Sequence, residues 1–403
     1  MRKSHLSLEQ VEALARGCLM ANGCDSANAE AVAATVTAAE RDGAASHGLF
    51  RIPGYVAALR SGKVNGRAQP KAEDLAPATL RMDGDGGFAP LAHRLSRPLL
   101  AERARTQGLA ALGIVNVHHF SALWVEVEAL AADGLVAFAC TCYTPSVAPA
   151  GSRQAFFGTN PIAFGWPRGD GRPPLVFDQA TAAMARGEVM IAARDGKELP
   201  PGVGLGPDGQ PSTDPKAVLE GVLLPFGGYK GSAISMMVEL LAAGLIGEGF
   251  SFEAARYDNK DGGPPRGGEF MLAIDPARLG DKEGWPDHAE GSSAGLPPLA
   301  RPRLPRDRRP AHPARHRGVQ RQQPGGHRVR SHRARAFDVN GGAIQKHRAL
   351  IHHRNDVSGH GAQNGPVRQH GDDHVALFGG IGGARSEERR VGKECRSRWS
   401  PDH

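Results

Sequence analysis

Apolar residues recur every three or four positions in the first part of the chain, a pattern that predicts several α-helices. The first begins after Ser7, where Ser7 and Gln10 match a capping box, and ends at Asn22-Gly23. An alanine-rich helix is expected next, with Asp25 or Ser26 at its start. This second helix is expected to end near residue 41. Further helices are predicted over residues 53–60 and 89–107.

The pattern changes after residue 108, where short β-prone apolar runs alternate with helical stretches. Strands are expected at residues 112–117, 135–140, 162–166, 175–177 and 270–274, and helices at 122–132 and 232–245. Such alternation predicts an α/β or mixed α+β fold.

Charge divides the chain unevenly and changes the interpretation of its last part. Residues 1–280 carry a net charge of −3, whereas residues 281–403 carry +10 and 12 of the 17 histidines. Residues 280–403 also lack sustained apolar periodicity, so we predict a low-order basic tail. We interpret this tail as translation that leaves the true reading frame near residues 290–293. A basic tail that binds nucleic acid is the alternative.

Cysteine and hydropathy patterns exclude other classes. The five cysteines have neither zinc nor disulfide spacing, and Cys140 and Cys142 are expected to be buried on one face of a strand. The start of the chain has no apolar signal-peptide core, and no stretch approaches 18 apolar residues. We therefore expect a soluble, cytoplasmic protein with no membrane partner.

The segment Ser46-His47-Gly48-Leu49-Phe50-Arg51 concentrates useful chemistry. An imidazole exchanges protons near neutral pH, and a guanidinium binds a carboxylate through two parallel hydrogen bonds. His47 and Arg51 are four residues apart, so they share a face if the segment is helical. Taken alone, the segment has a simpler interpretation, in which Ser46 caps a turn and His47 lies at the surface.

Two glycine-rich segments are candidates for phosphate binding. Gly204-Leu-Gly206-Pro-Asp-Gly209 matches a dinucleotide fingerprint, but prolines flank it where a strand and a helix are required, so we predict a surface turn. Pro225-Phe-Gly-Gly-Tyr-Lys-Gly-Ser232 places adjacent glycines and Lys230 before a helix. That arrangement suits an anion, and equally a simple helix-capping turn.

Three further segments carry polar groups in loops. The segment 118–121 follows a strand, where backbone donors at a helix start are expected to hold phosphate or ribose. His118 and His119 are neighbours that point apart, which argues against a metal ion. The loop 158–161 offers Thr159 and Asn160 for hydrogen bonding. Arg186-Gly187-Glu188 offers a cation and a carboxylate that can orient an imidazole, or else a solvated helix start.

Four of these segments occur together and in order: residues 41–48, 118–124, 158–161 and 225–232. Together they resemble the malate/L-lactate dehydrogenase type 2 family of NAD(P)-dependent oxidoreductases, over residues 5–279. Within the family, the segments are most similar to members that reduce cyclic 2-imino acids.

The resemblance implies a non-Rossmann α/β fold and a homodimer. It implies a helical, catalytic and dimerisation domain at residues 1–117 and an NADPH-binding mixed-sheet domain at 118–279. Ser46 and His47 would belong to a proton relay, with His47 the donor and Glu188 where the family usually has an aspartate. Arg51 and Thr159 would hold the substrate carboxylate. The cofactor would be NADPH, or alternatively NADH, bound by His119, Phe120, Ser121, Ala122, Leu123, Asp178, Gln179, Ala180, Arg186, Gly187 and Lys230.

The expected reaction is reduction of Δ1-piperideine-2-carboxylate to L-pipecolate or of Δ1-pyrroline-2-carboxylate to L-proline. Oxidation of a 2-hydroxy acid such as malate, lactate or ureidoglycolate is the alternative, because the same arginine and histidine serve both substrates. The aromatic run Phe164-Gly165-Trp166 favours the cyclic imine. No nucleic-acid partner and no metal are expected for the folded part.

Overall fold

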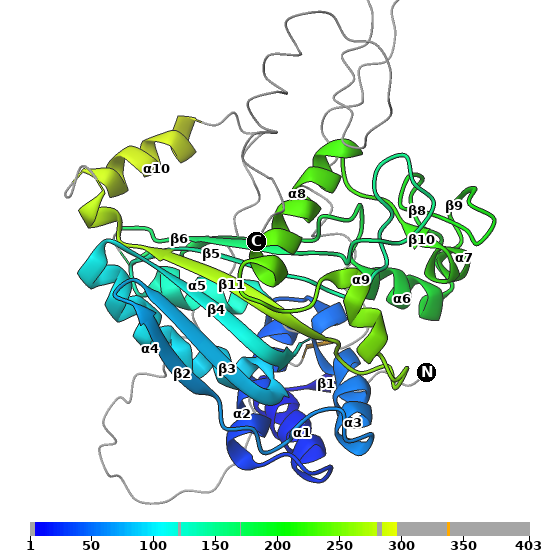
Figure 1. Cartoon of the computed structure of the whole chain (residues 1–403), viewed down its shortest axis with the longest axis horizontal. Coiled ribbons are helices and arrows are strands. Elements are labelled where there is room, and N and C mark those ends of the chain that lie inside the picture. Colours follow the sequence, from blue (N-terminus) through cyan, green and yellow to red (C-terminus); the bar gives the residue numbers. More distant parts are fainter. Residues whose placement is uncertain (1–4, 120–121, 170, 280–283, 296–336, 339–403) are drawn as a thin grey trace, which may run out of the picture. The chain divides into compact units, whose positions relative to one another are not determined.

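The computed structural model describes residues 5–119, 122–169, 171–279, 284–295 and 337–338 (Figure 1). Phe120, Ser121 and most of the predicted tail lie outside these residues. Within the described residues, no helix is long and apolar enough to cross a membrane.

Three N-terminal helices pack around a core of their own. They are α1 (Leu8–Met20), α2 (Ser26–Arg41) and α3 (Ile52–Arg60). The predicted capping box is present, because the Ser7 N–H donates to Gln10 Oε1 at 2.8 Å and the Gln10 N–H donates to Ser7 Oγ at 3.2 Å. Asp25 caps α2 through the Asn28 N–H. The shared core includes Val11, Leu19, Val32, Tyr55 and Phe88.

A seven-stranded sheet in the order β2-β3-β4-β11-β5-β6-β7 forms the centre of the fold. Only β3 and β4 run parallel; the other neighbouring strands are antiparallel. The strands are β2 (Lys71–Ala76), β3 (Thr79–Phe88), β4 (Leu109–His118), β5 (Val136–Thr141), β6 (Ile162–Trp166), β7 (Leu175–Gln179) and β11 (Arg266–Ile274). The predicted domain boundary at residues 117 and 118 thus falls at the end of β4, inside one sheet.

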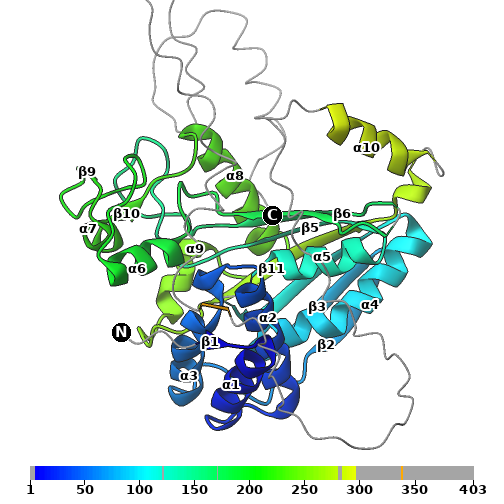
Figure 2. The ribbon, with the colours of Figure 1, turned by 180° about the vertical axis from the view of Figure 1, so that it is seen from behind.

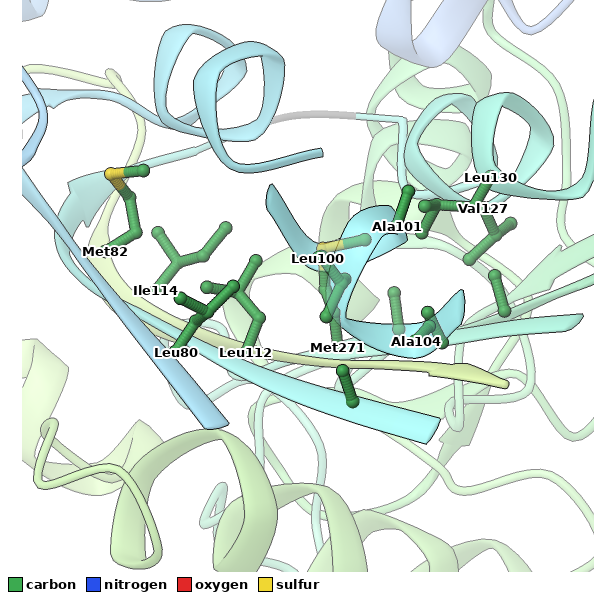
Figure 3. Packing of buried hydrophobic residues seen from close by; sticks show 14 of the residues in the cluster. Leu80, Met82, Leu100, Ala101, Ala104, Leu112, Ile114, Val127, Leu130 and Met271 are labelled. Atoms are coloured by element: carbon green, nitrogen blue, oxygen red, sulfur yellow. The ribbon is translucent and has the colours of Figure 1, made fainter. Parts of the chain in front are cut away.

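Helices cover both faces of this sheet. α4 (Ala89–Gln107) and α5 (Trp124–Ala132) pack on one face, with Leu112, Ile114 and Met271 beneath them (Figures 2 and 3). Neighbouring residues of the strands point the other way. Cys140 and Phe270 accordingly pack against α8 (Tyr229–Glu239) and the π-helical turn Leu240–Gly244 that follows it.

A smaller sheet, in the order β10-β8-β9, lies in the segment that contains the fingerprint-like glycines. Gly204–Leu205 is strand β8 and Gly209 sits at the turn before β9, with φ of +73°. The segment is therefore a turn, as predicted, within a β-hairpin, and strand β9 rather than a helix follows it directly. Nearby elements are β9 (Pro211–Ser212), β10 (Val222–Leu223), α6 (Arg186–Asp195), α7 (Pro215–Glu220) and α9 (Ser251–Ala254).

Part of the segment assigned to the tail forms a helix, α10 (Trp285–Gly295). Trp285 packs edge-on against Trp166 of β6, and Glu290 forms ion pairs with Arg168 and Arg172. Further along, β12 (Phe337–Asp338) pairs with β1 (His5–Leu6). The reading-frame change itself remains a prediction.

Candidate active site

Ser46, His47 and Arg51 lie in two consecutive 3-10 turns that follow α2, Ala45–His47 and Leu49–Arg51. Ser46 Oγ is 3.1 Å from His47 Nδ1, and Arg51 Nε donates to the Ser46 carbonyl at 2.7 Å. Ser46 and Arg51 are buried, whereas His47 is half-buried. The segment thus places a hydroxyl, an imidazole and a guanidinium side by side in a fixed arrangement.

Glu40 at the end of α2 holds this segment in place, a role that the sequence did not reveal. Its Oε1 accepts a hydrogen bond from the Leu49 N–H at 2.8 Å. A Cβ at Gly48 would lie 2.1 Å from the same oxygen, so any other residue there would displace the Glu40 side chain. Burial raises the pKa of the Glu40 carboxyl, and the Leu49 hydrogen bond opposes that rise.

Trp124, at the start of α5, packs edge-on against the His47 ring, with 6.2 Å between ring centroids and an interplanar angle of 85°. Its Nε1 donates to Asp42 Oδ2 at 3.0 Å. Trp124 belongs to the sequence segment 118–124 named above. Its contact with His47 depends on tertiary structure and was not predicted.

Asp178 links β7 to the start of α5. Its carboxylate accepts hydrogen bonds from the backbone N–H groups of Leu123 and Trp124, the latter at 3.2 Å. Burial raises the pKa of Asp178 to about 7 in spite of these bonds. Asp178, predicted to bind the cofactor, therefore also caps the helix that carries Trp124.

The start of α6 approaches the Ser46–Arg51 segment closely at Gly187. A Cβ at this position would lie 2.6 Å from Arg51 Nη2 and 3.0 Å from Ser46 Cβ. Glu188 follows directly in the first turn of α6. The predicted motif 186–188 and the Ser46–Arg51 segment thus lie together, as a relay of Ser46, His47 and Glu188 requires.

His119 is buried at the end of β4, where its Nε2 is 2.7 Å from Thr141 Oγ1. The Thr141 hydroxyl also lies 2.8 Å from the Gly268 carbonyl, so His119 Nε2–H is the natural donor to Thr141. Burial lowers the pKa of His119 to about 4, which keeps the ring neutral at pH 7. Ala122 and Leu123 follow with buried side chains, and the Ala122 carbonyl accepts a hydrogen bond from the Val125 N–H at 3.1 Å.

Thr159 is half-buried, and its carbonyl accepts hydrogen bonds from the Thr181 N–H at 2.9 Å and from Thr181 Oγ1 at 3.0 Å. Asn160 beside it is fully buried at a φ of +39°. Its Nδ2 donates to Glu239 Oε1 at 2.7 Å, and its Oδ1 accepts from Ser251 Oγ at 3.2 Å. Asn160 therefore anchors the loop through its side chain, and Thr159 does so through its carbonyl.

The segment 225–230 meets the same region. The Phe226 N–H donates to the Thr181 carbonyl at 3.0 Å, directly after the predicted residues Gln179 and Ala180. Gly227 and Gly228 have φ of +57° and +63°, and no atom lies within 4 Å of a Cβ built on Gly228. Exposed Lys230 lies in the first turn of α8, whose start has no side-chain cap. Open backbone, a helix start and a lysine fit a dinucleotide phosphate.

Two other predictions can be placed. Phe164 stacks on Trp166 and Phe177 along the outer strands of the sheet, so these rings contact one another rather than the Ser46–Arg51 segment. In the described part of the chain, no group of His, Cys, Asp and Glu side chains is arranged to hold a metal ion.

The sequence and fold are similar to those of known oxidoreductases. A family model described as malate/L-lactate dehydrogenase matches residues 6–298. A Delta(1)-pyrroline-2-carboxylate/Delta(1)-piperideine-2-carboxylate reductase of Pseudomonas aeruginosa is 52% identical over 274 residues, covering 68% of this chain and 82% of its own length. A Delta(1)-pyrroline-2-carboxylate reductase of Ancylobacter novellus is 50% identical over 275 residues, covering 68% and 80%.

Solved structures agree with this relationship. The delta1-piperideine-2-carboxylate reductase of Pseudomonas syringae pvar. tomato superposes with a TM-score of 0.69 at 45% identity, covering 75% of this chain and 91% of its own. A malate dehydrogenase of Entamoeba histolytica gives 0.68 at 25% identity, covering 73% and 84%. One conclusion follows from these matches, from the mixed sheet and from the absence of a Rossmann turn in the hairpin 204–209. The chain belongs to the malate/L-lactate dehydrogenase family of NAD(P)-dependent oxidoreductases.

Proposed function

We propose that this protein reduces a cyclic 2-imino acid, Δ1-pyrroline-2-carboxylate or Δ1-piperideine-2-carboxylate, with NADPH. The observation that carries the proposal is the contact of His47 with Ser46 beside buried Arg51. Relatives whose sequences are 52% and 50% identical to this chain are named as reductases of one or both of these cyclic imino acids, which supports this choice of substrate.

Arg51 and Thr159 hold the substrate carboxylate in this proposal. A guanidinium binds a carboxylate through two parallel bonds and stays charged at any working pH. The bond from Arg51 Nε to the Ser46 carbonyl fixes the guanidinium. A carboxylate bound there brings the adjacent C=N carbon and nitrogen close to His47.

His47 supplies the proton. Ser46 Oγ contacts Nδ1 of the ring, and in this proposal the imidazole gives its proton to the substrate nitrogen. In this proposal Glu188 completes the relay and stabilises the protonated ring. One proton and one hydride convert the C=N bond into CH–NH, so the reaction balances without another reactant.

NADPH, when bound, supplies the hydride. The residues that would hold it, with phosphate at the uncapped start of α8, are His119, Ala122, Leu123, Asp178, Gln179, Ala180, Arg186, Gly187 and Lys230. Phe120 and Ser121 lie outside the described residues, and we propose that they also bind the cofactor. The preference for NADPH over NADH belongs to the proposal.

We also propose a homodimer. Large apolar side chains are exposed on and beside α8: Leu240 is 55% exposed and Leu245 65% exposed, and Phe252 at the start of α9 is 43% exposed. An apolar surface of this kind is typical of a protein–protein contact.

A substrate panel tests the proposed reaction. NADPH oxidation is followed at neutral pH with Δ1-pyrroline-2-carboxylate and Δ1-piperideine-2-carboxylate, and NAD(P) reduction with malate and lactate. We expect turnover with the cyclic imines and at least about 100-fold lower kcat/KM with the hydroxy acids. A preference for a hydroxy acid would refute the proposal.

A further inference from the structure

Three ionisable side chains that the proposed reaction does not use meet in the interior beneath α4 and α5. His93 of α4 has its Nε2 2.9 Å from Glu269 Oε2 of β11 and 3.6 Å from Glu126 Oε1 of α5. The three side chains are at most 8% exposed. We call these residues the buried cluster.

The buried cluster is an expensive arrangement for the fold. His93 Nδ1, Glu126 Oε2 and Glu269 Oε1 have no hydrogen-bond partner among the described residues. Removing charges from water costs several kcal/mol per ion, and well-packed apolar residues often stabilise a core as well or better. Stability alone therefore does not account for these residues. A role in holding neighbouring elements in place would account for them.

Two short connections lead from the buried cluster to the candidate active site. Glu126 lies in the first turn of α5, two residues after Trp124, whose ring packs against His47. Glu269 follows Gly268, whose carbonyl is 2.8 Å from Thr141 Oγ1, the group that contacts His119 Nε2. His93 lies within ion-pair distance of both glutamates.

We propose that His93, Glu126 and Glu269 are positioning residues that hold Trp124 against His47 and keep β11 in register beneath His119. This inference rests on the imine reduction proposed above. A protonated imidazole between two acidic side chains fixes α5 relative to β11, and a shift of about 1 Å in a proton donor lowers turnover by about 100-fold.

The test compares His93→Gln, Glu126→Gln and the double variant His93→Gln/Glu269→Gln with the control Ser96→Ala. Ser96 is buried one turn further along α4 and its hydroxyl donates to the His93 carbonyl, outside the buried cluster. Steady-state kinetics with cyclic imine and NADPH give kcat, both KM values and the pH profile.

We expect His93→Gln to lower kcat at least about 10-fold, because the two acidic side chains then face each other without a cation. The KM for NADPH should change less than about threefold.

The double variant should recover kcat to within about threefold of wild type, because it removes one carboxylate with the cation. Glu126→Gln should retain kcat and extend activity to higher pH. Among the described residues, Asp178, His119 and Cys140 are other ionisable groups that interact with the buried cluster.

An unchanged kcat and pH profile in every folded variant would overturn the proposal. If His93→Gln does not fold, the double variant and Glu126→Gln decide the question. A second readout is independent of turnover: the ¹³C-histidine NMR signal of His47, assigned by its loss in His47→Gln. Its titration should move in the double variant and stay unchanged in Ser96→Ala. A moved signal in a protein that does not reduce imines would reject the proposed function and keep the positioning role.

Discussion

At the scale of single residues, small contacts decide what the site does. Gly48 and Gly187 leave room for Glu40 and Arg51, respectively, because a Cβ at either position would overlap them. Ser46 and Arg51 then hold each other through the bond from Nε to the Ser46 carbonyl. The chemistry of the segment thus depends on two positions that have no side chain.

Gly187→Ala should raise the KM for the cyclic imine at least about 10-fold, because the new methyl group displaces the Arg51 guanidinium. Binding of NADPH, measured by fluorescence titration, should weaken less. Met190→Ala, on the exposed side of α6, serves as the control. A larger effect on NADPH than on the imine would instead assign Gly187 to the cofactor alone.

At the scale of elements, local patterns predicted most helices and strands. The range of α4 was predicted in full, and so was that of β6, because apolar periodicity and capping residues act over a few neighbours. The hairpin of β2 and β3 was missed. All of β2 is exposed, and the glycine-rich end of β3 reads as a turn.

The candidate site was predictable as a set of segments and not as an arrangement. Ser46, His47 and Arg51 were found from residue types and spacing. The contact of Trp124 with His47 and the role of Glu40 depend on tertiary packing, which no local pattern encodes. The buried cluster was invisible for the same reason, since its members lie far apart in sequence on α4, α5 and β11.

The buried cluster predicts how stability depends on pH. Burial lowers the pKa of His93, but Glu269 and Glu126 outweigh it and raise the pKa to about 9 from 6.5. The resulting stabilisation is complete below pH 6.5 and is lost as pH rises through about 9. Burial raises the pKa of Glu126 to about 8, so the folded state retains this proton too and stability falls in the same direction.

Urea unfolding between pH 6 and pH 9.5 measures this dependence. The free energy of unfolding should decrease with rising pH in the wild type, and less steeply in Glu126→Gln, whose amide cannot ionise. Stability that rises over this range would contradict the assignment.

At the scale of the whole molecule, one mixed sheet unites segments that the sequence analysis placed in two domains. The Ser46–Arg51 segment comes from the N-terminal helices, whereas Asp178, Gly187 and Lys230 come from later segments. The family match to residue 298 and helix α10 extend the recognisable part beyond the predicted limit of residue 279.

The proposed homodimer is also tested at this scale. Sedimentation of the wild-type chain should give a mass of two chains, and Leu240→Glu combined with Leu245→Glu should shift it toward one. The charged side chains would disfavour burial of the apolar face of α8 and its continuation. A monomeric wild type would reject the dimer.

The most direct test of the central claim is kcat for cyclic imine reduction by His47→Gln, measured beside its NADPH dissociation constant. Because His47 is proposed to give the proton, kcat should fall by about 100- to 10,000-fold while NADPH binding changes by less than about threefold. A kcat within about threefold of wild type would contradict the assignment of Ser46, His47 and Arg51 as the active site.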